Sequence, residues 1–236
     1  MSALLKPESA SFAAVTRFSA LARLTEGERD ALADRERKRR APAHREIQSV
    51  GKPAGEPLIL LSGWACRTRT FFDGRRQILS MLLPGDLIGH AFRENAVAVT
   101  TVVALTEGVV MPAPAPAEGS GLAQAYAAAA ALEEVYLYRQ IARLGRLSAY
   151  ERLADWLLET RDRLAMAGLA SGDSFPMPLT QEALADLLGL TSVHINRTLQ
   201  SMRRDGALDL RGGTACLSEP RQLADLVDYR PATINR

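Results

Sequence analysis

Hydrophobic positions in residues 179–210 follow a helical period in two short stretches that meet at Gly189. In the first stretch, apolar residues recur three and four positions apart, which is typical of an amphipathic helix; they are Ala183, Leu184, Leu187 and Leu188. Thr180 precedes them as an N-cap. Thr191 or Ser192 caps the second stretch, whose apolar positions are Val193, Ile195, Leu199 and Met202. The pattern predicts two helices joined by a tight turn, where glycine supplies a positive φ.

The polar positions of the second helix point to a function. They are short or planar hydrogen-bonding groups on one face: Ser192, His194, Asn196, Arg197 and Gln200. Ala185 is small where the two helices must cross closely, so the segment fits a helix-turn-helix whose second helix enters a DNA major groove. Two apolar-polar runs then flank Gly212-Gly213, which predicts a hairpin and therefore a winged helix. The alternative is a helix pair of an ordinary helical bundle.

Short apolar runs separated by glycine and proline occupy residues 41–110 and predict an all-β roll or barrel. The runs lie at 58–61, 64–72, 77–83, 97–103 and 109–111, with hairpin turns at Asp73-Gly74 and at 84–86. Before them, residues 20–37 form an amphipathic pattern with Thr25 as N-cap, and residues 1–20 carry little sign of fixed structure. The basic run at 35–40 is interpreted as the solvated end of that helix, favoured by the helix dipole, with a nucleic-acid patch as the alternative.

Residues 122–147 predict one long helix with two apolar stripes, and residues 148–167 predict another helix after it. Two stripes imply two packing partners, one of them the β roll and the other an identical helix of a second subunit. The stripe assigned to dimerisation comprises Leu132, Val135, Tyr136 and Arg139; the other comprises Leu137, Ile141 and Leu144. A plain core helix is the alternative to a dimer seam.

Composition changes this picture little. The 236 residues carry a formal charge of +2, and residues 172–236 hold seven arginines against eight acidic residues, so the DNA-binding hypothesis rests on pattern rather than on bulk charge. The two cysteines, Cys66 and Cys216, are too few to hold zinc or an iron–sulfur cluster alone. We expect a cytoplasmic protein, since no apolar run approaches the roughly 20 residues of a membrane span.

The order helix, β roll, long helix and winged helix resembles the CRP/FNR family of bacterial transcription regulators. The resemblance is carried by LILLSGWAC at 58–66, DGRRQIL at 73–79, LPGDLIG at 83–89, AYERLADWL at 149–157 and the helix-turn-helix itself. It implies an α+β fold with a cyclic-nucleotide-binding-like sensor domain and N-terminal helix at 1–121. A dimerisation helix at 122–147 and a winged helix-turn-helix domain at 148–236 would follow.

The resemblance also implies a cytoplasmic homodimer on a double-stranded, pseudo-palindromic operator, with RNA polymerase as a further partner of an activator. Residues facing DNA would be Thr180, Thr191, Ser192, Val193, His194, Asn196, Arg197 and Arg211. The guanidinium fork of Arg197 suits guanine O6 and N7, and Asn196 suits adenine. Val193 replaces the acidic residue of some members and suits a thymine methyl group. Thr180, Thr191 and Arg211 suit phosphate contacts.

The effector is less well marked. Family members that bind cyclic AMP use a Gly-Glu pair and an arginine in the roll, whereas here Gly89 is followed by His90 and the strand at 97–103 has no arginine. A buried phosphate without a cation is costly, so the sequence predicts loss of ordinary cyclic-nucleotide binding. The candidate effector pocket comprises Gly85, Asp86, Gly89, His90 and Arg93, the cation nearest in sequence. Haem ligation by His90 and a redox role for Cys66 are alternatives to ordinary structural roles.

The leading hypothesis is therefore a DNA-binding regulator with an altered or vacant sensor and no resident cofactor. The alternative is a ligand-responsive module, sensing a cyclic nucleotide or a haem-bound gas, that controls DNA binding or another partner. An enzyme is not expected, because the sequence contains no catalytic triad order, HExxH motif or P-loop. Membrane association is not expected either. Activator and repressor remain equally open.

Overall fold

The computed structural model describes residues 10–34, 36–89 and 95–234. Two helices begin the chain, α1 (Ala10–Leu21) and α2 (Glu26–Ala33). The prediction that residues 1–20 lack fixed structure is wrong for α1, because Ala14 and Phe18 share one buried face of the helix. The Phe18 ring meets the Tyr126 ring edge-on, with 5.1 Å between centroids. Tertiary packing therefore stabilises a helix whose local sequence signal is weak.

The helix expected at 20–37 is confirmed in part. Thr25 forms a capping box with Glu28 at the start of α2, but the helix ends at Ala33. Arg35 lies outside the described residues, and the rest of the basic run is not a helix terminus. Arg39 and Arg40 lie exposed on the edge strand β1 (Arg39–Ala41), which pairs with β8 (Gly108–Pro112). Charged side chains on an edge strand oppose pairing with other chains.

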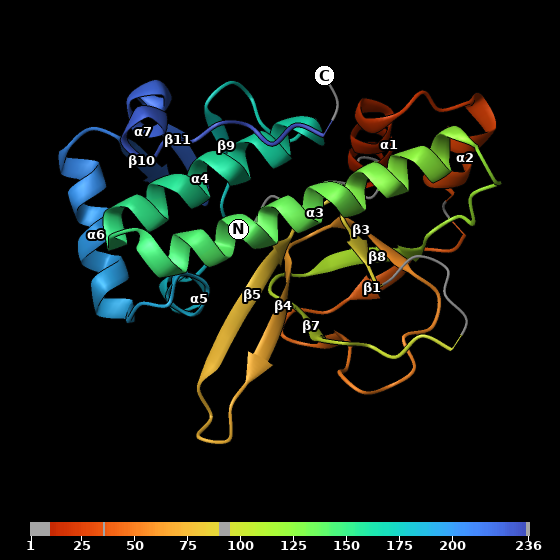
Figure 1. Ribbon diagram of the computed structural model, residues 1–236, viewed down its shortest axis with the longest axis horizontal. Coiled ribbons are helices and arrows are strands. Elements are labelled where there is room, and N and C mark those ends of the chain that lie inside the picture. The colour runs from red at the N-terminus through yellow and green to blue at the C-terminus, as the bar shows by residue number, and fades with distance from the viewer. Residues whose placement is uncertain (1–9, 35, 90–94, 235–236) are drawn as a thin grey trace.

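Two sheets form the roll, as the strand pattern predicts. One has the order β1-β8-β3-β6 and the other β2-β7-β4-β5. The remaining strands are β2 (Glu46–Gln48), β3 (Leu58–Ser62), β4 (Ala65–Thr70), β5 (Arg76–Leu82), β6 (Leu87–Ile88) and β7 (Thr101–Ala104). Inward side chains of both sheets, including Leu60, Leu82 and Val102, form one buried cluster. The β4–β5 hairpin turns at Asp73-Gly74 and projects well beyond the roll (Figure 1).

Two long helices connect the roll to the C-terminal part. Ser120 caps α3 (Gly121–Arg146), and Ser148 forms a capping box with Glu151 at the start of α4 (Ala149–Met166). The chain reverses between them, so that α4 lies alongside α3 (Figure 1). Among the described residues, no helix is long and apolar enough to cross a membrane.

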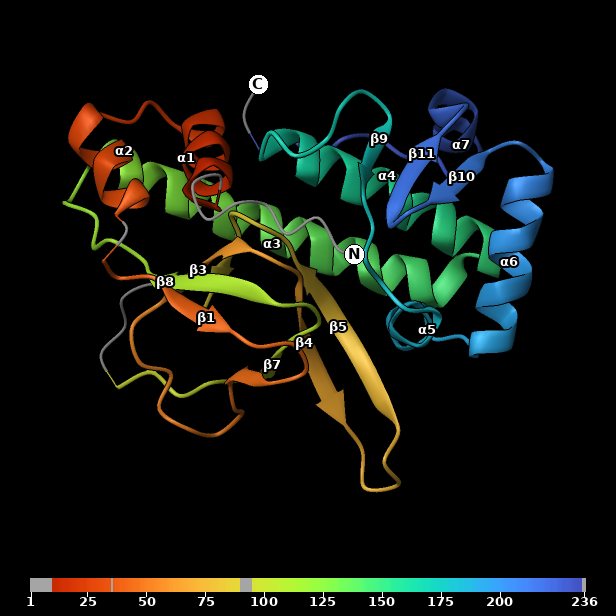
Figure 2. The same ribbon diagram turned by 180° about the vertical axis from the view of Figure 1, so that it is seen from behind.

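The predicted winged helix is present. Helices α5 (Gln181–Leu188) and α6 (Ser192–Arg204) are followed by the hairpin β10 (Leu208–Arg211) and β11 (Thr214–Leu217). Strand β9 (Ser174–Pro176) completes a small sheet of order β10-β11-β9, and α7 (Pro220–Leu226) packs on α4. Figure 2 shows α5 beside β5 of the roll and α6 at the end of the molecule. The α+β architecture is thus the one the sequence predicts.

Candidate DNA-binding surface and roll cavity

The turn between α5 and α6 has the geometry of a helix-turn-helix. The side chain of Thr180 accepts a hydrogen bond from Ala183 N at 3.1 Å, and that of Thr191 accepts one from His194 N at 3.2 Å. Gly189 ends α5 with φ 64°, and the next amide, Leu190 N, donates back to Ala185 O at 3.1 Å. Because glycine adopts this left-handed conformation without strain, the chain can turn sharply between the two helices within residues 189–191.

Helix α6 divides into a buried face and an exposed face. Ile195, Thr198, Leu199 and Met202 are buried against α5 and α4. The opposite face is exposed and carries most of the predicted DNA-contacting residues, namely Ser192, Val193, His194, Asn196 and Arg197. Val193 is 61% exposed and presents an apolar group on this face. Thr180, Thr191 and Arg211 are also exposed.

The arginines of this surface differ in whether another group of the chain already pairs with them. Within the described part of the chain, Arg197 has no hydrogen bond or ion pair. Arg211 is 3.0 Å from Asp209 on the same hairpin strand, and Arg203 donates to Leu210 O at 3.2 Å. An unpaired, solvated guanidinium on the outward face of α6 is free to pair with an acceptor that another molecule brings.

The dimerisation stripe predicted from the sequence needs correction. Leu132 is 1% exposed and Tyr136 is 8% exposed, because both side chains pack inside their own chain. Arg139, also in that stripe, stacks on the Tyr229 ring and donates to Arg230 O, and Val135 is half-buried. The face of α3 that remains free carries Leu137, Tyr138 and Ile141, which is 69% exposed. The periodicity predicts two stripes, and the structure buries most of the one assigned to dimerisation and leaves Leu137 and Ile141 of the other exposed.

The predicted effector residues lie at a small cavity between the roll, α1, α3 and α4. Asp86 and Gly89 line it, and Gly85 does not line it but lies against Arg17, which does. His90 and Arg93 lie outside the described residues. The cavity has a volume of about 100 Å³. Pockets that hold small organic ligands usually measure about 300–1,000 Å³. Gly85 has φ 93°, and a Cβ there would lie 2.7 Å from Arg17 Cδ, so glycine also makes room for that arginine.

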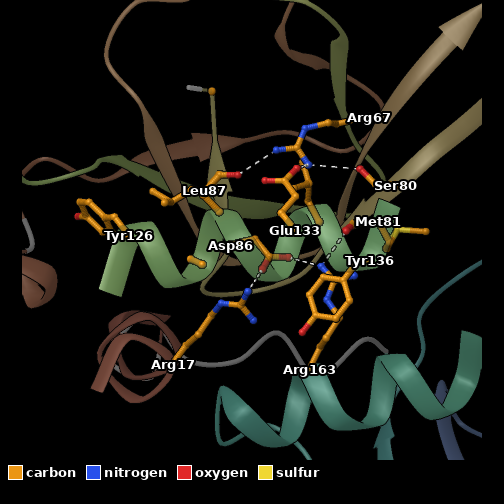
Figure 3. A pocket seen from close by; sticks show the side chains of 14 residues that line it. Arg17, Arg67, Ser80, Met81, Asp86, Leu87, Tyr126, Glu133, Tyr136 and Arg163 are labelled. Atoms are coloured by element: carbon orange, nitrogen blue, oxygen red, sulfur yellow. Dashed lines mark hydrogen bonds and ion pairs between the residues drawn. The ribbon is translucent and has the colours of Figure 1, made fainter. Parts of the chain in front are cut away.

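Asp86 is the centre of the charges around this cavity (Figure 3). Arg17 Nη2 of α1 lies 2.8 Å from Oδ1, and Arg163 Nη2 of α4 lies 2.6 Å from Oδ2. Leu83 N donates to Oδ2 at 2.7 Å. Burial raises the pKa of Asp86, but the charges of Arg17 and then Arg163 outweigh burial and leave the pKa below its ordinary value. The carboxylate is therefore fully engaged by its own chain.

The ion pairs continue from the roll into α3 and α4. Arg163 also contacts Glu159, and Glu159 is 2.8 Å from Arg143, which in turn contacts Asp155 at 2.6 Å. The Arg163 guanidinium lies over the Tyr136 ring at 4.6 Å. Burial lowers the pKa of Arg163, yet the carboxylates of Asp86 and Glu159 raise it further, so the group stays charged. This buried network of ion pairs joins the roll to α3 and α4, the two helices that precede the helix-turn-helix in the chain.

Sequence reasoning missed the cations of this site. Arg93 is the nearest in sequence, but Arg17, Arg67 and Arg163 line the cavity in space, and Arg67 pairs with Glu133 of α3. They come from three segments that are far apart along the chain, so no spacing rule joins them. An arginine among the buried positions of a helix, as Arg17 and Arg163 are, is the signal that could have found two of them.

Cys66 has the ordinary structural role. Its side chain is fully buried on β4, and burial raises the pKa of the thiol to about 12. A thiol that stays protonated is a poor nucleophile.

Family models match both halves of the chain. A cyclic nucleotide-binding domain matches residues 38–117, and a Crp-like helix-turn-helix domain matches residues 151–226. Together with the roll, the long helices and the winged helix, these matches define a class of two-part regulators that join a roll of the cyclic-nucleotide-binding type to a helix-turn-helix.

The chain is also similar in sequence to proteins that are named as regulators. The chain is 33% identical over 161 residues to the nitrogen fixation regulation protein FixK of Bradyrhizobium diazoefficiens, a match covering 65% of this chain and 66% of the relative. It is 32% identical over 160 residues to the transcriptional activator protein FnrL of Cereibacter sphaeroides, covering 65% and 64%. The matched region thus spans slightly under two thirds of each of these relatives.

Solved structures show the same fold. FixK2 from Bradyrhizobium japonicum superposes with a TM-score of 0.68 at 24% identity, covering 84% of this chain and 98% of that chain. A CRP-family transcriptional regulator from Thermus thermophilus gives 0.63 at 21% identity, covering 82% and 98%. The chain belongs to the CRP/FNR family, as its sequence motifs indicate.

Proposed function

We propose that this protein is a homodimeric, sequence-specific DNA-binding regulator of transcription, and not an enzyme. The observation that carries the proposal is the outward face of α6, where an unpaired arginine, amide and hydroxyl groups and one exposed valine stand on a helix fixed by its buried face. Specific DNA readers place such a helix in the major groove. Its relatives FixK and FnrL are named as a regulation protein and a transcriptional activator.

Individual side chains take distinct roles in this proposal. Arg197 pairs with guanine, Asn196 with adenine, and Val193 contacts a thymine methyl group, since these chemistries match the base edges. Ser192 and His194 lie beside them at the start of α6. Contacts to phosphate come from Thr180, Thr191 and Arg211, which position the protein without reading sequence.

Dimerisation uses the exposed stripe of α3. Leu137, Tyr138 and Ile141 leave an apolar face uncovered in the single chain, and exposed Ala127 and Ala131 continue it toward the helix N-terminus. Pairing two such helices would bury these side chains and relate two α6 helices by a twofold axis, matching an operator with two inverted half-sites. In this division residues 1–121 form the sensor part, 122–147 the dimer helix and 148–236 the DNA-binding part.

The roll acts without ordinary cyclic-nucleotide binding. Its cavity is small, and Asp86 is already neutralised by Arg17 and Arg163. RNA polymerase is a partner if the protein activates transcription, and the setting is the cytoplasm.

The test is selection of double-stranded DNA from a random pool by the purified protein. We expect enrichment of one inverted-repeat motif whose half-sites are about one helical turn apart. A pool that remains random after several rounds would contradict the proposal.

A second arm of the test addresses the ligand-responsive alternative. Melting of the protein is followed with cyclic AMP and cyclic GMP in the absence of DNA, and we expect no saturable shift. A saturable shift would favour that alternative.

A further inference from the structure

The C-terminal end of α5 is held by side chains from three other elements. The last carbonyl groups of a helix have no partner within the helix. Here Gln77 Nε2 of β5 donates to Asp186 O at 2.7 Å, Gln140 Nε2 of α3 donates to Leu187 O at 2.7 Å, and Arg152 Nη1 of α4 donates to Leu188 O at 3.0 Å. Consecutive carbonyls of the first helix of the helix-turn-helix are thus fixed from three directions.

An ion pair reinforces the contact from the roll. Nε and Nη2 of Arg76 both lie 2.7 Å from Asp186 Oδ2, and both side chains are partly buried. Arg76 and Gln77 are neighbours at the start of β5, just after the hairpin turn, on the part of the hairpin that extends beyond β7. Strand β5 passes beside α5 (Figure 2). One short stretch of strand therefore contacts both the backbone and the side chain of the same helix end.

Helix α6 follows any movement of α5. The two helices are joined by the short turn at Gly189, and α6 packs its buried Ile195 and Leu199 on α5 and α4. A tilt of α5 against α3 would therefore tilt the exposed face of α6 as well. In a dimer related through α3, such a tilt changes the separation of the two α6 helices.

We infer that Arg76 and Gln77 are positioning residues for DNA reading, through which β5 of the roll sets the orientation of the helix-turn-helix. The inference rests on the proposed DNA-binding function. These two residues do not face the operator; they determine at which half-site spacing the two α6 helices can both engage. Arg197 and its neighbours on α6 read the bases. The roll determines the distance and orientation between the two α6 helices of the dimer.

The test removes the donors from β5 while keeping side-chain length: the double variant Arg76→Met, Gln77→Met. Arg75→Met is the matched control, because Arg75 is adjacent but pairs with Asp73 on its own hairpin. Each protein selects DNA from the same random pool. We expect wild type and control to enrich one spacing. The double variant should enrich the same half-site sequence with its preference for that spacing reduced about tenfold.

A second measurement is independent of DNA. Spin labels at Gln124→Cys on α3 and Gln200→Cys on α6, in a Cys216→Ser background with labelled chains diluted by unlabelled ones, report the distance between the helices. We expect a narrow distribution for wild type and the Arg75→Met control and a broad one for the double variant.

The two readouts separate the failures. If wild type selects no motif, the proposed function fails, while the label distances still judge the positioning role. If the double variant keeps both the wild-type spacing preference and the narrow distribution, the inference is overturned. Equal loss of affinity at every spacing, with unchanged distances, also overturns it, since that result describes a merely structural contact.

Discussion

Two polar regions of this molecule use their charges in opposite ways. On the outward face of α6, Arg197 is exposed and has no partner within the described residues. At the roll cavity, Asp86 is buried and paired with Arg17 and Arg163. Both regions look like candidate sites in the sequence, because both combine charged and small residues next to apolar runs.

The difference shows how to tell a binding surface from a buried ion-pair network that holds the fold together. A group that must bind another molecule keeps its hydrogen-bonding capacity free, whereas a buried charge has to be neutralised within the protein. By that criterion the α6 face is open to a partner, and the residues around Asp86 hold the roll to α1 and α4.

The largest effect is expected for Asp86→Ala. This change leaves Arg17 and Arg163 buried without their shared counterion, and breaking a buried pair costs about 3–5 kcal/mol. Urea denaturation should show a loss of that size in the free energy of unfolding. Asp73→Ala is the control, since among the described residues Asp73 forms its ion pair with exposed Arg75 on its own hairpin, and a loss under about 1 kcal/mol is expected. Equal losses would contradict the contrast.

The same pair predicts a pH dependence. Arg17 and Arg163 leave the pKa of Asp86 below its ordinary value despite burial, so its stabilising contribution is fully present above the unfolded-state pKa of about 3.9. It is lost as the pH falls through the lower, folded-state pKa. The difference in unfolding free energy between wild type and Asp86→Ala should therefore shrink below about pH 4. A difference that is constant down to pH 2 would be contrary to this account.

Ile141→Glu tests whether the exposed face of α3 is an interface. Burying an isoleucine side chain contributes roughly 1.5–3 kcal/mol, and a dimer would lose two. We expect dimer dissociation to be favoured by at least about 3 kcal/mol, measured by sedimentation equilibrium. Leu226→Glu is the control, because Leu226 is also exposed but lies on α7, which packs on α4. Unchanged self-association of Ile141→Glu would assign the interface elsewhere.

Arg197→Ala should weaken binding of the selected operator by about 1–3 kcal/mol and relax specificity at one base pair of each half-site. Arg211→Ala is the comparison within the same domain. As a phosphate contact, it should weaken binding to all sequences alike and reduce the salt slope by about 1. Both effects are read from titrations on operator and scrambled duplexes. Operator binding by Arg197→Ala that is as tight and selective as wild type would refute the base-reading role.

The smallest effect concerns the two thiols. Cys66 is buried with its pKa raised to about 12, whereas Cys216 is partly exposed on β11. A thiol reagent at pH 8 should label one cysteine per native chain quickly and the second only in denaturant. Cys216→Ser should show no fast labelling. Rapid reaction of both thiols would place Cys66 in an accessible position.

Local sequence patterns are enough to predict most of the secondary-structure elements and their order. Thr25, Ser148, Thr180 and Thr191 are helix caps, and Gly189 ends α5, because these depend on interactions within a few residues. The winged helix and the outward face of α6 follow from the same short-range patterns.

The folded arrangement of the chain, and not any local pattern, sets which surfaces are free. It placed Leu132 and Tyr136 inside the chain and left Ile141 outside, although both stripes of α3 are apolar. It also brought Arg17 and Arg163 to Asp86, across 69 and 77 positions of sequence respectively. Periodicity shows that a helix has an apolar face, but the neighbour that covers that face, and the partner of a buried charge, come from distant segments that meet only when the chain folds.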